Sequence, residues 1–146
     1  KKYILIYPNN DPGNEIIIKK LKDLTKKNKE KFIFIKSMRF EYFLTLLKNS
    51  EFIIGNSSVG IREAPFYGVP TIDLGERQKF RGKSKSIKNF NFEEKKILTY
   101  IKKLNNKFES SRYYGTGDSI SKIKKIIEKD SFWNTKIQKH FIIDRS

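Results

Sequence analysis

The sequence predicts an α/β domain built around a parallel β-sheet. Short apolar runs typical of strands alternate with segments whose apolar residues recur at helical spacing, roughly every 20 to 30 residues. Parallel strands need long crossover connections and are covered on both faces, so this alternation favours βαβ units. Glycines and small polar residues follow several of the strand runs, as they do at the ligand-binding edge of such sheets. We therefore expect a doubly wound parallel sheet of the Rossmann-like kind.

The first third of the chain contains two predicted strand–helix pairs. Residues 3–7 form a continuous apolar run, and a turn rich in Pro, Asn and Gly follows at residues 8–13. Asn14 can cap the helix that comes next. Within this helix the apolar residues Ile17, Leu21 and Leu24 fall at positions i, i+4 and i+7, the spacing of one helix face. Residues 32–35 predict a second strand, and residues 40–49 predict a second helix whose inward residues are Phe43, Leu44 and Leu47.

The middle of the chain predicts a third strand, a helix and a fourth strand. The apolar runs at residues 51–54 and 69–74 are the two strands. The helix between them contains Pro65, which has no backbone N–H to donate. We therefore expect this helix to start late or to kink near Ile61.

Beyond the fourth strand we expect, in order, a mobile basic loop, a short fifth strand and two helices, at residues 76–86, 86–90, 93–106 and 119–129. Asp118 is expected to cap the last of these helices. We expect residues 1–130 to form one Rossmann-like domain. Residues 131–146 would be a tail that is partly helical and holds the only Trp of the chain.

Composition excludes several classes of site and partner. The chain has no Cys and a single His, His140, so no disulfide or thiolate metal site is possible, and we predict neither a metal nor a cofactor. The net charge is +16 but comes from 26 Lys and only 6 Arg spread through every segment. Because Arg is the side chain that reads bases and clamps phosphates bidentately, we disfavour nucleic-acid binding.

The chain shows no sign of membrane insertion or secretion. No apolar run approaches the roughly 20 residues of a membrane span, and no secretory signal opens the chain. We therefore expect a cytoplasmic protein. The chain begins Lys1-Lys2-Tyr3 without Met, and we expect it to be a piece of a longer polypeptide.

The strongest candidate site follows the third predicted strand. Asn56, Ser57 and Ser58 stand where a helix begins, and backbone N–H groups and the helix dipole can bind an anion there. The same residues are also preferred helix caps, so a purely structural role is the alternative. Neither a GxGxxG nor a GxxxxGK[ST] pattern is present. The sequence alone therefore predicts a phosphate site without a known nucleotide fingerprint.

Further candidates lie near the same edge of the sheet. Glu63 follows Ser58 by five residues, roughly 7.5 Å along a helix, where a carboxylate can accept hydrogen bonds from ribose hydroxyls. Arg77 can hold phosphate oxygens bidentately; Arg62 is a weaker candidate of the same kind. Asn9, Met38, Ser57 and Arg77 all follow predicted strands, so we expect them to share one edge.

Four segments resemble a known family, in the right order. They are residues 7–13 (YPNNDPG), 39–43 (RFEYF), 55–78 (GNSSVGIREAPFYGVPTIDLGERQ) and 114–117 (YGTG). Over roughly residues 3–130 the chain is similar to the C-terminal half of UDP-N-acetylglucosamine 2-epimerases, most of all the hydrolysing type of sialic-acid and related nonulosonate pathways.

The resemblance implies one half of a GT-B-type fold, with UDP held mainly by this half. By position it implies that Ser57 and Ser58 bind the diphosphate, that Glu63 binds the ribose, and that Arg77 contacts a phosphate or the ribose. It also implies a backbone contact from Met38 to uracil and a nucleotide-side contact from Asn9. No catalytic residue is implied within this chain.

The implied activity is elimination of UDP from the sugar, followed by hydration to the manno epimer. The family's acid/base groups and essential His would precede Lys1, so we expect the chain alone to bind UDP weakly and to catalyse nothing. Expected partners are UDP or a UDP-sugar, the missing N-terminal domain and, for the full-length protein, a second copy. A close relative acting on UDP-diacetylbacillosamine, a GT-B glycosyltransferase and a basic nucleic-acid-binding domain remain alternatives.

Overall fold

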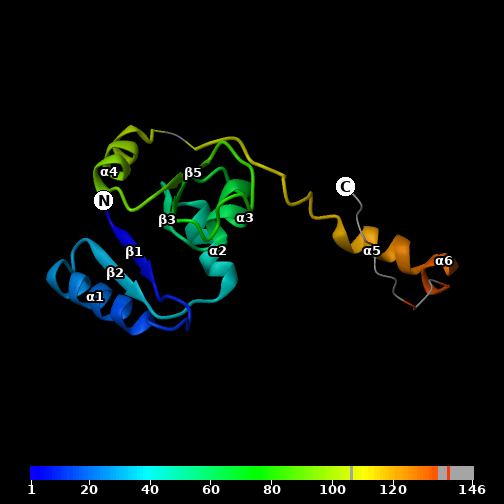
Figure 1. Ribbon diagram of the computed structural model, residues 1–146, viewed down its shortest axis with the longest axis horizontal. Coiled ribbons are helices and arrows are strands. Elements are labelled where there is room, and N and C mark those ends of the chain that lie inside the picture. The colour runs from blue at the N-terminus through cyan, green and yellow to red at the C-terminus, as the bar shows by residue number, and fades with distance from the viewer. Residues whose placement is uncertain (106, 135–137, 139–146) are drawn as a thin grey trace. The chain divides into compact units, whose positions relative to one another are not determined.

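The computed structural model describes residues 1–105, 107–134 and 138, and it divides into two compact units. The first unit is Lys1–Glu51, and the second begins at Phe52. Each unit has its own parallel ladder of strands (Figure 1). The predicted parallel α/β class is therefore confirmed, with the hydrogen-bonded strands organised as two ladders.

The first unit is a strand–helix–strand–helix segment. Its elements are β1 (Tyr3–Ile6), α1 (Asn14–Lys27), β2 (Phe32–Ile35) and α2 (Phe40–Lys48). β1 and β2 pair in parallel, from Tyr3 opposite Phe32 to Ile6 opposite Ile35. The rings of Tyr3 and Phe32 stack with centroids 5.3 Å apart, a cross-strand pair that fixes this register.

The start of α1 differs from the prediction. The residue before the helix is Gly13, whose φ of 84° is left-handed, and Asn14 is already the first helical residue. The side-chain amide of Asn14 donates to the carbonyl oxygen of Asn9 at 2.9 Å instead of capping the helix. Glycine adopts this φ without steric cost, which explains why the turn places Gly13 at the boundary.

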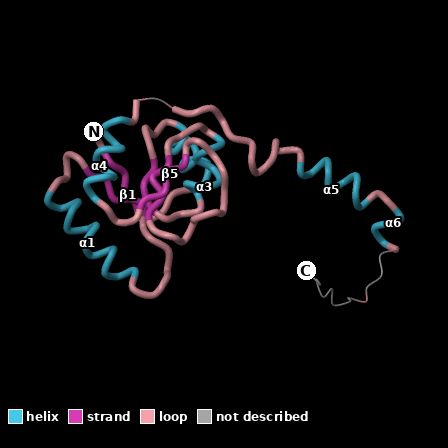
Figure 2. The backbone as a smooth tube through the Cα atoms, turned by 45° about the horizontal axis from the view of Figure 1, so that its top comes forward, coloured by secondary structure: helices cyan, strands magenta, loops and turns pink. Residues whose placement is uncertain are grey.

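The second unit contains a three-stranded parallel sheet in the order β3-β4-β5. Its strands are β3 (Ile53–Gly55), β4 (Thr71–Leu74) and β5 (Ile87–Phe90), and its helices are α3 (Val59–Phe66), α4 (Glu94–Lys103), α5 (Ser119–Ile127) and α6 (Asp130–Trp133). Helix α3 lies beside β5 in Figure 1 and in Figure 2. These elements match the predicted ones to within a few residues at each end.

The core of the second unit lies where α3 packs on β4. Ile61, Ala64, Val69 and Ile72 are all buried there. Gly60 permits the close approach, because a Cβ at this position would lie 2.6 Å from Cγ2 of Thr71. The hydroxyl of Thr71 donates to the carbonyl oxygen of Gly60 at 2.7 Å, which ties the helix to the strand.

The predictions for the Pro65-containing helix and for the C-terminal tail can be compared with the structure. α3 begins at Val59 and ends at Phe66, so Pro65 stands in its last turn and the expected late start is not seen. A short helix accommodates Pro65 because only one intrahelical hydrogen bond is lost. Part of the predicted tail is helical, in α6, whereas residues 135–137 and 139–146, with His140, lie outside the described residues. Among the described residues, no helix is long and apolar enough to cross a membrane.

Candidate functional site

The predicted phosphate site is a turn between β3 and α3, residues 56–58, which we call the serine turn. Ser58 immediately precedes the helix, and its carbonyl oxygen accepts hydrogen bonds from the N–H groups of Ile61 and Arg62 at 3.0 and 2.9 Å. Its side chain makes no capping hydrogen bond. Oγ of Ser57 accepts only a long bond of 3.4 Å from the N–H of Val59. Of the two serines, only Ser57 therefore caps the helix, through one long and weak hydrogen bond.

Glu63 lies on the second turn of the same helix. Its side chain is half-buried, and its Oε2 is buried with no hydrogen-bond partner among the described residues. An unpaired buried carboxylate oxygen is unfavourable, since desolvation is not compensated by a donor. A ligand that brings hydroxyl groups to this helix would supply the missing donor.

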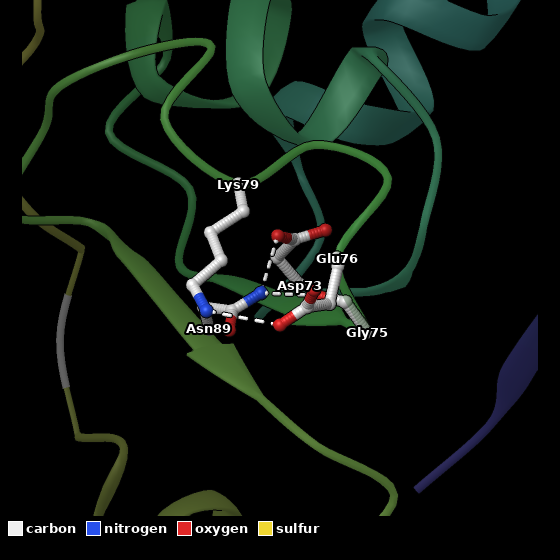
Figure 3. A network of polar contacts seen from close by, with 5 residues as sticks. All are labelled: Asp73, Gly75, Glu76, Lys79 and Asn89. Atoms are coloured by element: carbon white, nitrogen blue, oxygen red, sulfur yellow. Dashed lines mark hydrogen bonds and ion pairs between the residues drawn. The ribbon is translucent and has the colours of Figure 1, made fainter.

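Arg77 lies in the loop after β4, residues 75–82, which we call the arginine loop. The loop begins at Gly75, whose φ of 76° only glycine adopts readily. The side-chain amide of Asn89 donates both to the carbonyl oxygen of Gly75, at 2.7 Å, and to Oδ2 of Asp73, at 2.8 Å (Figure 3). Asn89 therefore fixes the direction in which the chain leaves the sheet toward Arg77.

The arginine loop and the residues just after it are strongly cationic. Residues 76–86 contain one carboxylate, Glu76, and five cations, which are Arg77, Lys79, Arg81, Lys83 and Lys85. Lys79 forms an ion pair with Glu76 at 3.0 Å, drawn in Figure 3. Such a concentration of one sign of charge attracts anionic ligands.

Gln78 joins the serine turn to the arginine loop, a link that the sequence prediction missed. Its side chain is only 4% exposed. Its Nε2 donates to the carbonyl oxygen of Asn56 at 3.1 Å, and its Oε1 accepts from Nη1 of Arg81 at 3.2 Å. The available signal was weak, because a glutamine in a polar, lysine-rich stretch looks solvent-exposed.

Arg62, the weaker phosphate candidate, contacts an aromatic ring. Its guanidinium lies 5.9 Å from the ring centroid of Tyr114. The hydroxyl of Tyr114 in turn donates to the carbonyl oxygen of Arg81. The segment around Tyr114 therefore contacts both α3 and the arginine loop.

Asp118 occupies the N-cap position of α5, as predicted, but its side chain makes no capping hydrogen bond. Its carboxylate accepts from the hydroxyl of Thr116 at 2.8 Å and lies 3.0 Å from the ammonium of Lys122. The Thr116 hydrogen bond and then the Lys122 hydrogen bond lower the pKa of Asp118 below its ordinary value.

The remaining two candidates belong to the first unit. Asn9 follows the end of β1, and Met38, which is half-buried, follows the end of β2. Because β1 and β2 run in parallel, the two residues share one edge of that ladder. By the same argument Ser57 and Arg77 share one edge of the ladder in the second unit. Ser58 immediately precedes the adjoining helix α3, and Glu63 lies on it.

Comparison with known proteins shows which family and which relatives this chain is similar to. The family model described as UDP-N-acetylglucosamine 2-epimerase matches residues 1–128. The chain is 46% identical over 144 residues to "UDP-N-acetylglucosamine 2-epimerase" of Neisseria meningitidis serogroup B, which covers 95% of this chain and 37% of that protein. The chain thus spans little more than a third of this relative's length.

Two further relatives are similar over shorter stretches. "Polysialic acid biosynthesis protein P7" of Escherichia coli is 38% identical over 99 residues, 68% of this chain and 25% of that protein. "GDP/UDP-N,N'-diacetylbacillosamine 2-epimerase (hydrolyzing)" of Campylobacter jejuni is 35% identical over 79 residues, 54% of this chain and 21% of that protein.

Proposed function

The chain belongs to the UDP-N-acetylglucosamine 2-epimerase family, and we propose that it is the UDP-binding part of a hydrolysing member of that family. The hydrolysing type is supported by the sequence resemblance and by the name of the Campylobacter relative, which is called a hydrolysing 2-epimerase. The substrate would be UDP-N-acetylglucosamine or a close UDP-sugar, and the products the manno epimer and UDP.

The observation that best supports UDP binding is the environment of Glu63. Its Oε2 is buried and unpaired, and it lies on the helix that begins at the serine turn. A nucleoside diphosphate matches this arrangement, because its phosphates need donors at the start of α3 and its ribose offers two hydroxyl donors further along. Ser57 and Ser58 would contact the diphosphate, and Glu63 the ribose.

Arg77 would stabilise the departing diphosphate. Elimination places negative charge on the leaving UDP, and preorganised donors that match this charge lower the barrier. The cationic arginine loop supplies such an environment, and Asn89 holds its first residue in place. The sequence resemblance also implies that Asn9 and Met38, on the first unit, contact the nucleotide, and these two roles stay predictions.

Calorimetric titration of this chain with UDP and with ATP tests the binding proposal. UDP is expected to bind and ATP to bind much more weakly or not at all. Equal affinity for the two nucleotides would contradict the proposal, because nonspecific attraction of phosphate to a chain of net charge +16 would explain it.

The reaction type needs the complete polypeptide. Release of the free manno sugar together with UDP would support the hydrolysing type, and accumulation of an epimerised UDP-sugar would favour the reversible type. Transfer of the sugar to an acceptor would indicate a glycosyltransferase instead.

A further inference from the structure

Arg81 is held toward the serine turn although it lies four residues beyond Arg77. Its Nη1 donates to Oε1 of Gln78 at 3.2 Å, and Nε2 of the same amide donates to the carbonyl oxygen of Asn56 at 3.1 Å. Gln78 is 4% exposed, so this amide is desolvated and both of its hydrogen bonds constrain it. One buried side chain thus separates the Arg81 guanidinium from the backbone of the serine turn.

The backbone at Arg81 is fixed from the other side of the loop. The hydroxyl of Tyr114 donates to the carbonyl oxygen of Arg81. The next residue, Gly82, packs so closely on α3 that an added Cβ would lie 2.5 Å from Cγ2 of Ile61. Arg81 is therefore anchored at its main chain and at its guanidinium, while the residue as a whole is exposed.

The nearby cations are engaged differently. The guanidinium of Arg62 lies over the ring of Tyr114, and the ammonium of Lys79 is paired with Glu76. Arg81 is hydrogen-bonded to a neutral amide, which leaves its charge uncompensated by that contact. A guanidinium has several N–H donors in a planar fork, so the bond to Gln78 leaves others to meet phosphate oxygens.

We propose that Arg81 is a second guanidinium that binds the diphosphate, and that Gln78 is its positioning residue. This inference rests on the proposed binding of UDP at the serine turn. Two arginines from one loop would then share the negative charge of a diphosphate, and Gln78 would set the distance between Arg81 and the turn.

The test compares Arg81→Ala with Arg112→Ala in the complete polypeptide, by calorimetry with UDP and with uridine. Arg112 is an exposed arginine of the same unit whose guanidinium lies 5.7 Å from the ring centroid of Phe66, at the opposite end of α3. Both variants remove one positive charge. Arg81→Ala should weaken UDP binding about 10- to 100-fold and leave uridine binding within about twofold, because a charge-assisted hydrogen bond is lost. Arg112→Ala should change neither.

The role of Gln78 is tested by Gln78→Met, which keeps an unbranched side chain but removes both hydrogen-bonding groups. This variant should weaken UDP binding in the wild-type background and have little further effect in Arg81→Ala, because Gln78 acts through Arg81. An equal loss in both backgrounds would show that Gln78 supports the fold only.

The outcomes separate the two proposals. A wild-type protein that does not bind UDP would remove the proposed function. A wild-type protein that binds UDP, with unchanged affinity in Arg81→Ala or with equal losses for UDP and uridine, would overturn only the role of Arg81.

Discussion

The hydroxyl of Thr71 on β4 donates a 2.7 Å hydrogen bond to the carbonyl oxygen of Gly60 on α3. Both residues lie in the core of the second unit, and Thr71 is 2% exposed. This contact sets how α3, with Glu63 on its second turn, lies on the sheet. The packing of α3 on β4 therefore depends on the absence of a side chain at Gly60 and on the hydroxyl of Thr71, which faces it.

Gly60→Ala should lower the free energy of unfolding by about 1–3 kcal/mol, because the new methyl group would overlap Cγ2 of Thr71. Urea denaturation measures this change. In Thr71→Ser, which keeps the hydroxyl but removes Cγ2, the same Gly60→Ala substitution should cost clearly less. Equal costs in the two backgrounds would show that the clash lies elsewhere.

Glu63→Gln should weaken UDP binding by about 1.5–3 kcal/mol, since a carboxylate accepts charge-assisted hydrogen bonds from ribose hydroxyls and an amide oxygen accepts weaker ones. Calorimetry of the variant beside the wild type measures the loss. Glu94→Gln, a change of the same kind at the exposed first turn of α4, is the matched control. An unchanged titration for Glu63→Gln would remove this residue from the site.

Arg77→Ala should weaken binding of UDP more than binding of uridine, because its proposed contact is to a phosphate. A difference of about 1.5–3 kcal/mol between the two ligands is expected for a charged hydrogen bond. If both ligands lost affinity equally, Arg77 would act on the nucleoside or on the loop structure instead.

Phe80 is the only described non-glycine residue with positive φ, at 65°, and its side chain is 93% exposed. Phe80→Gly should raise the free energy of unfolding by about 1 kcal/mol, because a left-handed backbone costs an L-residue about 1–2 kcal/mol. Phe80→Ala keeps the backbone cost and should change stability little. Thermal denaturation of the pair distinguishes the backbone from the ring, and a gain of equal size in both variants would contradict this account.

Thr116→Val should raise the pKa of Asp118 toward its ordinary value of 3.8, because the Thr116 hydroxyl is the main cause of the lowering. Since the folded-state pKa is depressed, the associated stabilisation is complete above 3.8 and disappears as the pH falls through the folded-state pKa. A carboxyl NMR titration measures the shift. Lys122→Met should move the pKa by a smaller amount, and the reverse order would contradict the assignment.

Local patterns predicted the strands and the turns that follow them. The apolar runs before Asn56 and Glu76 ended where the strands end, because a buried strand needs continuous apolar residues and a turn needs small or polar ones. The placement of Ser57 and Arg77 on one edge followed from parallel pairing. Their roles with a ligand remain predictions.

Features set by tertiary contacts were not predictable. The sequence does not show that Gln78 is buried, because its burial depends on Asn56, which is 22 residues away in the chain. Ile120, Ile123 and Ile127 recur at helical spacing in α5, yet all three are exposed. Periodicity identifies a helix, but what covers its apolar face depends on other segments.

The amide of Asn89 has chemical consequences beyond its geometry. Both of its N–H donors are in use, one to Asp73 and one to the carbonyl oxygen of Gly75. A replacement side chain of the same length would need two N–H donors to make the same contacts. Deamidation at this position would set a second acidic group against Asp73 and release the Gly75 carbonyl. Slow spontaneous deamidation of Asn89 would therefore change the direction of the arginine loop, which carries Arg77.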